Sequence, residues 1–346
     1  MKTKTYLMLT MLVIAALSCK KSTDNMPAPN PTPPVVNPPR PYVPDNSFKI
    51  VAYMPSYQNP ETVDIGKYKM ITHLFYAFLN PNVDGTLVAL ASPTNFNTVM
   101  QRAKANNLKF GISVSGLSTT FATMASSATA RNTFTKNVLA FARNNNLDGV
   151  DMDWEYPTTT APISSADNFT LLMKELSDSL HKYQKFLSAA VTPGVYAGGI
   201  RDGIKAEVYP YVDFFNIMQY DGQTYEPTDP NQHASYNMSV KSLDIWLNTK
   251  GLPKEKAVCG MPAYGRNTTG TALTYRAIEA AGNDMTLNKG TVNGVDYWFN
   301  GTTMIKLKTQ LAKDRANGIM FWEFAQDSNT ANSLLKAAND QLGRAY

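Results

Sequence analysis

Four carboxylates lie close together in one apolar stretch of the chain. The run LDGVDMDW (147–154) has the composition of a buried β-strand, in which successive side chains point to opposite faces. Asp151, Asp153 and Glu155 therefore share one face of the expected strand, because they are two residues apart. Asp148 is out of phase by one residue, and we expect it to be structural. The opposite face carries Val150, Met152 and Trp154.

This group of carboxylates has the composition of an acid–base site. Like charges held so close cannot all ionise, so at least one pKa must rise. A carboxylic acid that stays protonated near neutral pH can serve as a general acid. The alternatives are a metal site of hard oxygen ligands and a solvated acidic edge strand. The spacing lacks the glycine of a calcium-binding loop, and the apolar opposite face favours burial, so catalysis is the preferred interpretation.

The acidic residues end the fourth of eight apolar runs that follow one another along the chain. The runs are short and rich in β-branched and aromatic residues, as in parallel strands covered by helices. They are 48–54, 70–79, 108–115, 147–154, 185–192, 212–220, 256–264 and 317–324. Segments with helix signals lie between or after them, at 92–107, 129–145, 164–183, 238–248, 302–316 and 329–342.

This alternation predicts an α/β fold over residues 48–346, a single (β/α)8 barrel of the TIM type. The carboxylates then point into the barrel at its C-terminal mouth, where the active sites of such barrels lie. An open doubly wound sheet is the alternative, but no glycine-rich phosphate loop follows any of the strands. Only a short insertion fits between the seventh and eighth strands.

Charge and composition argue against several classes of function. The net charge of +5 comes from basic and acidic residues mixed along the chain, which gives little support to nucleic-acid binding. The three histidines, His73, His181 and His233, lie far apart, so we expect no metal site and no cofactor. Cys259 lies in an apolar run, and we expect it to be a buried thiol outside any disulfide.

The first residues have the pattern of an export signal. Residues 1–18 combine two early lysines with an apolar stretch too short to span a membrane, and we interpret them as a signal peptide. The sequence Ala16-Leu17-Ser18-Cys19 resembles the lipobox of bacterial lipoproteins, which implies acylation of Cys19 and a membrane anchor. Residues 19–47 are proline-rich and predict an extended spacer. We expect an exported monomer anchored in the outer membrane, on either face.

Four motifs at strand ends resemble those of glycoside hydrolase family 18, the chitinases and their relatives. The acidic strand, 148–155, matches the D-x-x-D-x-D-x-E signature of the family. The sixth run ends in Met218-Gln219-Tyr220-Asp221, similar to M-x-Y-D, and residues 260–266 are similar to G-x-P-x-Y-G-R. Trp322 lies on the eighth run, where the family has a tryptophan. The resemblance covers nearly all of the chain from residue 48, and it implies a barrel.

The resemblance implies hydrolysis of β-1,4-linked N-acetylglucosamine polymers or oligomers, with retention and with the substrate's own acetamido oxygen as nucleophile. Glu155 is implied as the proton donor, and Asp153 as the partner of the acetamido N–H. Asp151 is implied to share a proton with Asp153. Tyr220 is implied to hold the acetamido oxygen, with Asp221 near the cleaved bond.

The remaining expected site residues line or support the binding pocket. Met218 is implied to line it, and Trp322 to form an apolar floor under the reacting sugar. Tyr53 and Ser113 are expected to support Asp151 from below. We also expect substrate contacts from Tyr264, Arg266 and Trp298.

The sequence departs from the family pattern in two places. The third strand has Ser113-Val114-Ser115-Gly116 in place of S-x-G-G, so the support of Asp151 can differ. The insertion after Arg266 is short, and the segment 296–298 is left to supply an aromatic wall, which predicts an open cleft. Two other functions stay open. One is an endo-β-N-acetylglucosaminidase acting on N-glycans, and the other is a non-catalytic protein that binds chitin oligosaccharides.

Overall fold

The computed structural model describes residues 41–346 of the chain. The expected signal peptide and Cys19 lie outside the described residues. Residues 41–47, which the sequence assigns to the spacer, contact the barrel. Tyr42 stacks on His181 with ring centroids 3.9 Å apart, and Asn317 Nδ2 donates to the carbonyl oxygens of Asn46 and Ser47 at 3.0 and 3.2 Å. None of the helices in the described range is long and apolar enough to cross a membrane.

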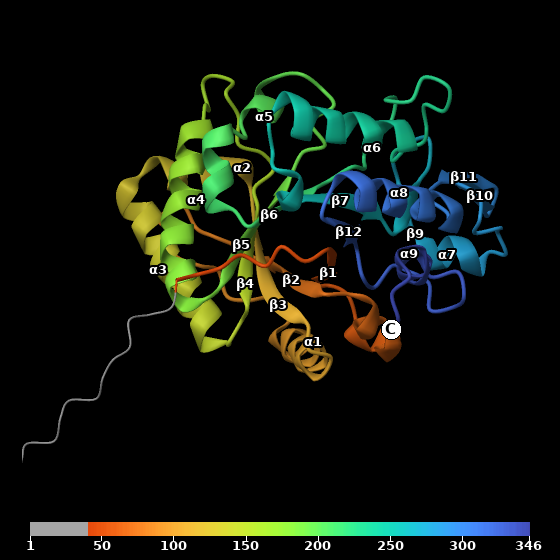
Figure 1. Cartoon of the computed structure of the whole chain (residues 1–346), viewed down its shortest axis with the longest axis horizontal. Helices are drawn as coiled ribbons and strands as arrows, with labels where there is room; N and C mark the ends of the chain where they lie inside the picture. Colours follow the sequence, from red (N-terminus) through yellow and green to blue (C-terminus); the bar gives the residue numbers. More distant parts are fainter. Residues whose placement is uncertain (1–40) are drawn as a thin grey trace, which may run out of the picture. The chain divides into compact units, whose positions relative to one another are not determined.

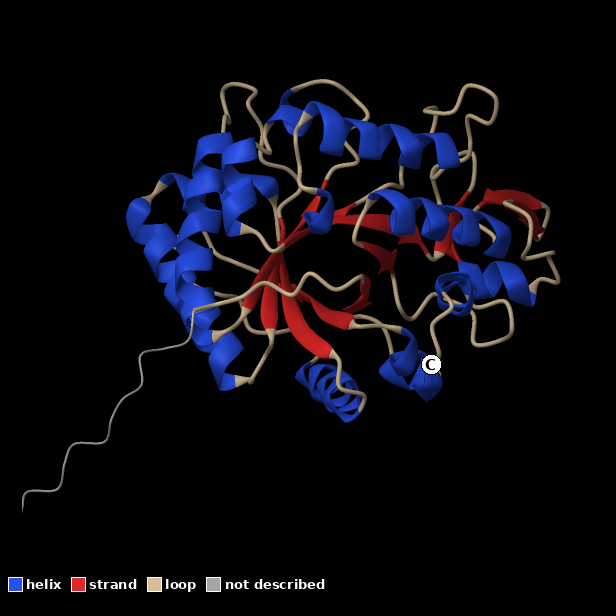
Figure 2. Cartoon of the chain, viewed as in Figure 1, coloured by secondary structure: helices blue, strands red, loops and turns tan. Residues whose placement is uncertain are grey.

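A closed barrel of parallel strands forms the centre of the molecule, in the order β1-β12-β7-β6-β5-β4-β3-β2 (Figure 2). The eight strands correspond to the eight apolar runs, and the barrel confirms the expected fold. They are β1 (Lys49–Pro55), β2 (His73–Leu79), β3 (Lys109–Ser115), β4 (Gly149–Asp153), β5 (Phe186–Val191), β6 (Phe214–Ile217), β7 (Ala257–Pro262) and β12 (Gly318–Trp322).

Helices surround the strands (Figure 1). Those in the expected segments are α1 (Pro93–Ala105), α3 (Ala128–Asn144), α4 (Ala166–Leu180), α6 (Tyr236–Leu243), α8 (Thr302–Arg315) and α9 (Leu334–Leu342). Three short helices were not predicted, namely α2 (Ser118–Ser126), α5 (Gly199–Asp202) and α7 (Tyr275–Ala280). The expected helix at 238–248 changes to a π-helical turn at Asp244–Thr249, and α9 begins later than expected. Short 3-10 helices occupy Pro60–Thr62, Ile65–Met70, His181–Tyr183, Ala206–Tyr211 and Lys254–Lys256.

The segment between β7 and β12 folds into a small antiparallel sheet with the order β10-β11-β8-β9. Its strands are β8 (Tyr264–Arg266), β9 (Ala272–Thr274), β10 (Lys289–Val292) and β11 (Val295–Trp298), and α7 lies between the second and third. Because β8 follows β7 almost directly, the sheet carries Tyr264 and Arg266 at the end of a barrel strand.

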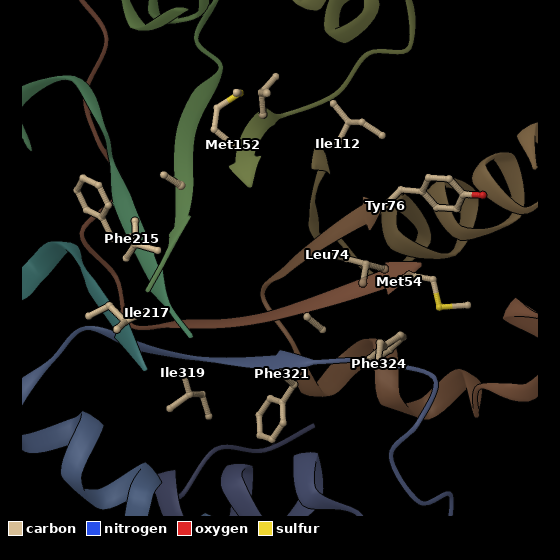
Figure 3. Close-up of a cluster of buried hydrophobic side chains, with 14 of the residues drawn as sticks. Met54, Leu74, Tyr76, Ile112, Met152, Phe215, Ile217, Ile319, Phe321 and Phe324 are labelled. Atoms are coloured by element: carbon tan, nitrogen blue, oxygen red, sulfur yellow. The ribbon is translucent and has the colours of Figure 1, made fainter. Parts of the chain in front are cut away.

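The two faces of β4 differ as its alternating pattern requires. Val150, Met152 and Trp154 belong to the core between strands and helices, where Trp154 stacks on Phe121 of α2 with centroids 5.2 Å apart. Figure 3 shows Met152 in this core, with side chains from the neighbouring strands arranged around the outside of the barrel. The alternate residues of β4, Asp151 and Asp153, therefore point into the barrel.

Candidate active site

A cavity of about 360 Å³ opens at the C-terminal ends of the barrel strands. Its lining combines carboxylates with aromatic rings and one guanidinium. The lining residues are Tyr57, Phe78, Ser115, Asp153, Glu155, Tyr156, Met218, Tyr220, Asp221, Tyr264, Arg266, Ala272, Trp322 and Gln326. The structure thus gathers residues from all four motifs into one cavity, because parallel strands of a barrel end at the same mouth.

Asp151 lies below the cavity and is completely buried. Its Oδ2 accepts hydrogen bonds from Tyr53 Oη at 2.9 Å and from Ser113 Oγ at 2.8 Å. Its Oδ1 accepts from Ser188 Oγ at 2.7 Å and from Asn216 Nδ2 at 3.3 Å. Burial raises the pKa of Asp151, and these hydrogen bonds act in the opposite direction. Four donors on two oxygens suit a carboxylate rather than a carboxylic acid.

Two of these four donors were missed in the sequence. Ser188 and Asn216 are polar residues within the apolar runs of β5 and β6, and Ser188 is the register partner of Asp151. A polar residue at an inward position of a buried strand needs a hydrogen-bond partner. That need, combined with the strand order, is the signal that could have identified both of them.

Asp153 lies one step closer to the mouth, and 5% of its surface is exposed. Burial raises its pKa well above the usual range, and the charges of Glu155 and Asp151 raise it further. A hydrogen bond with Ser115, its register partner on β3, only partly opposes this rise. The Oδ1 atom of Asp153 is buried and has no hydrogen-bond partner among the described residues. Its surroundings therefore favour the protonated form of Asp153, and one of its oxygens is left for a ligand.

The outer residues of the acidic segment occupy different environments. Glu155 is exposed and lines the cavity, two residues beyond Asp153. Asp148 lies at the other end of β4 and accepts from the backbone N–H of Phe110 at 2.9 Å. It also lies 3.6 Å from Lys109 Nζ. Asp148 thus joins β3 to β4 away from the cavity, in a structural position.

An aromatic floor lies beside the carboxylates. The Trp322 ring is stacked with Phe78 at a centroid distance of 5.7 Å and is tilted against Tyr53 at 5.6 Å. Tyr220 is buried and packs edge-on against Tyr264 at 6.3 Å. These rings give the cavity a flat apolar surface, of the kind that matches the CH face of a sugar.

Asp221 is held by three residues around the cavity rim. Arg266 donates through Nε and Nη2 at 2.6 and 2.7 Å, and Tyr264 Oη donates at 2.6 Å. His233 Nδ1 lies 3.3 Å away. Burial opposes the ionisation of Asp221, but hydrogen bonds from His233, Arg266 and Tyr264 outweigh it and hold its pKa well below the usual range. The backbone of Asp221 has φ of 61°, a conformation that few residues other than glycine adopt.

The sequence did not assign His233 to the site. It is completely buried behind Asp221, and its ring packs against that of Tyr264 at 5.1 Å. It lies in the loop that follows Asp221, outside any strand, so no strand periodicity could have placed it there.

Trp298 does not line the cavity, contrary to the expectation of an aromatic wall. It lies on β11, directly opposite Arg266 of β8, and only 8% of its surface is exposed. Its ring is covered by Lys289, whose Nζ lies 4.8 Å from the ring centroid. In its place, the insertion contributes Arg266 and Ala272 to the lining. Across residues 41–346, no group of three or more His, Cys, Asp or Glu side chains could hold a metal ion.

Comparison with known proteins gives one family. Residues 49–327 match the model of glycosyl hydrolases family 18. "Chitinase 1" of Aphanocladium album is 26% identical over 79% of this chain and 79% of its own length. "Nod factor hydrolase protein 1" of Medicago truncatula is 31% identical over 60% of this chain and 59% of its own.

Solved structures share the fold. The GH18 chitinase ChiB of Flavobacterium johnsoniae aligns with a TM-score of 0.69 and 28% identity, over 85% of this chain and 94% of that chain. A GH18 chitinase of Cycas revoluta, solved in complex with (GlcNAc)3, aligns with a TM-score of 0.72 and 24% identity, over 85% of this chain and 100% of that chain.

Proposed function

The chain belongs to glycosyl hydrolase family 18, and from this premise we propose that its cavity hydrolyses β-1,4-linked N-acetylglucosamine oligomers or polymers. The protein is a chitinase-type glycoside hydrolase. One observation carries the proposal. Asp151 on the inward face of β4 is fixed by four donors, Asp153 on the same face is buried with a raised pKa, and Glu155, two residues beyond the end of the strand, is exposed in the cavity.

The proposed reaction retains the configuration of the anomeric carbon and uses the substrate as its own nucleophile. The acetamido carbonyl oxygen attacks the anomeric carbon while the bond to the leaving sugar oxygen breaks. Glu155 transfers its proton to that oxygen, and an oxazolinium ion forms. Glu155, now a carboxylate, removes a proton from a water molecule. The oxygen of this water attacks the anomeric carbon and opens the oxazolinium ring. Glu155 is protonated again, and the protein is restored.

Asp153 and Asp151 have separate tasks in this proposal. The unpaired Oδ1 atom of Asp153 accepts the acetamido N–H and so aligns the nucleophilic oxygen. The negative charge of Asp151, buried directly below, stabilises the positive charge that develops on the acetamido group. Because its four donors come from β1, β3, β5 and β6, Asp151 is held without rearrangement during the reaction.

The opposite side of the cavity positions the sugar. Trp322 supports the apolar face of the reacting ring, and Tyr220 holds the acetamido oxygen. Asp221 is ionised and oriented by Arg266 and Tyr264, so it offers an acceptor to substrate hydroxyl groups near the cleaved bond.

The test is product release from chitotetraose and from a high-mannose glycoprotein, comparing wild type with Glu155→Gln. We expect cleavage of chitotetraose by the wild type and a loss of at least about a hundredfold in Glu155→Gln, the scale of general acid catalysis. Asp148→Asn is the matched control, because it removes a charge from the same strand outside the cavity. Cleavage of the glycoprotein alone would make the protein an endo-β-N-acetylglucosaminidase. Binding of oligomers without turnover would make it a lectin.

We also propose that the protein is a monomeric lipoprotein, anchored through Cys19 in the outer membrane. The lipobox-like sequence and the proline-rich spacer support this. The first described residues contact the end of the barrel where the strands begin, around Lys49, His73 and Lys109. Labelled palmitate should enter the wild type but not Cys19→Ala, and equal labelling of both would refute the anchor. Light scattering checks the oligomeric state.

A further inference from the structure

A second buried carboxyl group, outside the acidic strand, lies beside the cavity. Glu323 directly follows Trp322 and is completely buried. Its Oε1 accepts from Gln58 Nε2 at 2.7 Å, and its Oε2 accepts from the backbone N–H of Ala325 at 2.7 Å. The side chain of Gln326 lies close enough to lower the pKa of Glu323, as Gln58 and the backbone of Ala325 also do. The reaction proposed above gives Glu323 no task.

Gln326 connects this carboxyl group to the cavity. Its side chain lines the cavity, while its Oε1 atom is buried and has no hydrogen-bond partner among the described residues. Burial raises the pKa of Glu323 to about 7, so the group is mainly a carboxylate above that pH. A carboxylate can only accept hydrogen bonds, so the ionised form favours the orientation in which the amide NH2 of Gln326 faces Glu323. The amide oxygen is consequently left for another partner. Buried polar atoms without a partner are rare in native proteins, and each calls for an explanation.

We propose that Gln326 Oε1 is a substrate-binding acceptor, which Glu323 orients toward a hydroxyl or acetamido N–H of the sugar next to the one over Trp322. This inference rests on the proposed chitin-type substrate and adds a binding position to it. Gln326 is placed for it because it lies four residues after Trp322, in the loop that follows β12. Tyr57 also lines the cavity, on the side where β1 pairs with β12. It directly precedes Gln58, whose side chain donates a hydrogen bond to Glu323. Glu323 itself does not line the cavity, so it is a positioning residue.

The physical role of Glu323 is to fix one of two amide orientations. A glutamine amide presents either its oxygen or its NH2 group when it turns by half a revolution about the last side-chain bond. When Glu323 is ionised, above its raised pKa of about 7, the inverted orientation is unfavourable, because two oxygens would then face each other. The oxygen of the Gln326 amide therefore already faces the position of the sugar hydroxyl. No rotation of the amide is needed when the sugar binds, which favours binding.

The first test compares Gln326→Met with wild type in the hydrolysis of chitotetraose. Methionine keeps the length and shape of the side chain and removes both polar atoms. We expect KM to rise about fivefold, as for the loss of one neutral hydrogen bond, and kcat to fall by less than KM rises. Gln101→Met, on the exposed face of α1, is the control for the same chemical change. An unchanged KM in Gln326→Met would overturn the proposal.

The second test examines the orienting role. Glu323→Gln replaces one accepting carboxylate oxygen with an NH2 group, so the orientation of the Gln326 amide is no longer fixed, and KM should rise by a similar factor. If Glu323 acts through Gln326, the double variant should be no weaker than Gln326→Met alone. Additive losses would refute the positioning role. If Glu323→Gln folds poorly, as its Tm would show, two other measurements replace it. One is the KM of Gln58→Leu for chitotetraose. The other is the affinity of Glu155→Gln/Gln326→Met for (GlcNAc)4, compared with that of Glu155→Gln. A wild type without activity on chitotetraose would instead refute the proposed function itself.

Discussion

The four hydrogen-bond donors around Asp151 lead to a prediction about how the stability of the protein depends on pH. Tyr53→Phe removes the donor at 2.9 Å from Asp151 Oδ2, together with the acceptor of a 2.8 Å hydrogen bond from Asn216 Nδ2, and leaves the rest of the ring in place. A hydrogen bond to a charged acceptor contributes about 1.5–3 kcal/mol, whereas one to a neutral acceptor contributes about 0.5–1.5 kcal/mol. The loss should therefore be about 2 kcal/mol where Asp151 is ionised and about 1 kcal/mol where it is protonated.

The sign of the pH dependence follows from the direction of the pKa. Burial raises the pKa of Asp151, so the group is neutral in acid and becomes charged as the pH rises through that value. Removing a donor destabilises the charged form more than the neutral form and raises the pKa further. The difference in unfolding free energy between Tyr53→Phe and wild type must therefore grow as the pH rises through the raised pKa of Asp151.

The assay is urea unfolding of both proteins at a series of pH values. Tyr76→Phe is the matched control, because the Tyr76 hydroxyl donates to two backbone carbonyls, at 3.1 and 2.9 Å, far from any carboxylate of the site. Its cost should be about 1 kcal/mol and independent of pH. A cost for Tyr53→Phe that is constant across pH, or that shrinks as the pH rises, would refute the reasoning that Asp151 is a hydrogen-bonded carboxylate.

Two further predictions concern the cavity and its rim. Trp322→Leu should lower kcat/KM for chitotetraose about a hundredfold, because it removes the floor under the reacting sugar. Trp298→Leu should lower Tm and change KM by less than about twofold, since Trp298 lies outside the lining; equal losses in kcat/KM would contradict this division. His233→Leu removes one polar partner of Asp221, so its pKa should rise and the acidic limb of the kcat/KM profile should shift to higher pH. An unshifted profile would show that Arg266 and Tyr264 are sufficient.

The periodicity of the sequence was most informative where strands are buried on both faces. Alternation with period two placed Asp151, Asp153 and Glu155 on one side of β4 and Trp154 on the other, because a one-residue shift would reverse every side chain. The barrel followed from the repetition of such runs. The small sheet of the insertion was missed because its strands have three or four residues each, too few for a periodic pattern.

The partners of the site were harder to predict than its carboxylates. Ser188 on β5 and Asn216 on β6 donate hydrogen bonds to Asp151, and this role can be inferred only when the strand order and register are known. His233 and Gln326 lie on loops, whose paths a periodic pattern does not specify. Trp298 was expected in the cavity because of its residue type, but its position opposite Arg266 on β11 places it beneath Lys289.

The central claim is that Glu155 protonates the leaving oxygen while the substrate's acetamido group attacks, and the configuration of the first products tests it most directly. Proton NMR during the hydrolysis of chitotetraose should show the β-anomer of the new reducing end first, followed by slow mutarotation. The same spectra with Glu155→Gln should show no product on that timescale. Initial release of the α-anomer, or unimpaired hydrolysis by Glu155→Gln, would contradict the account.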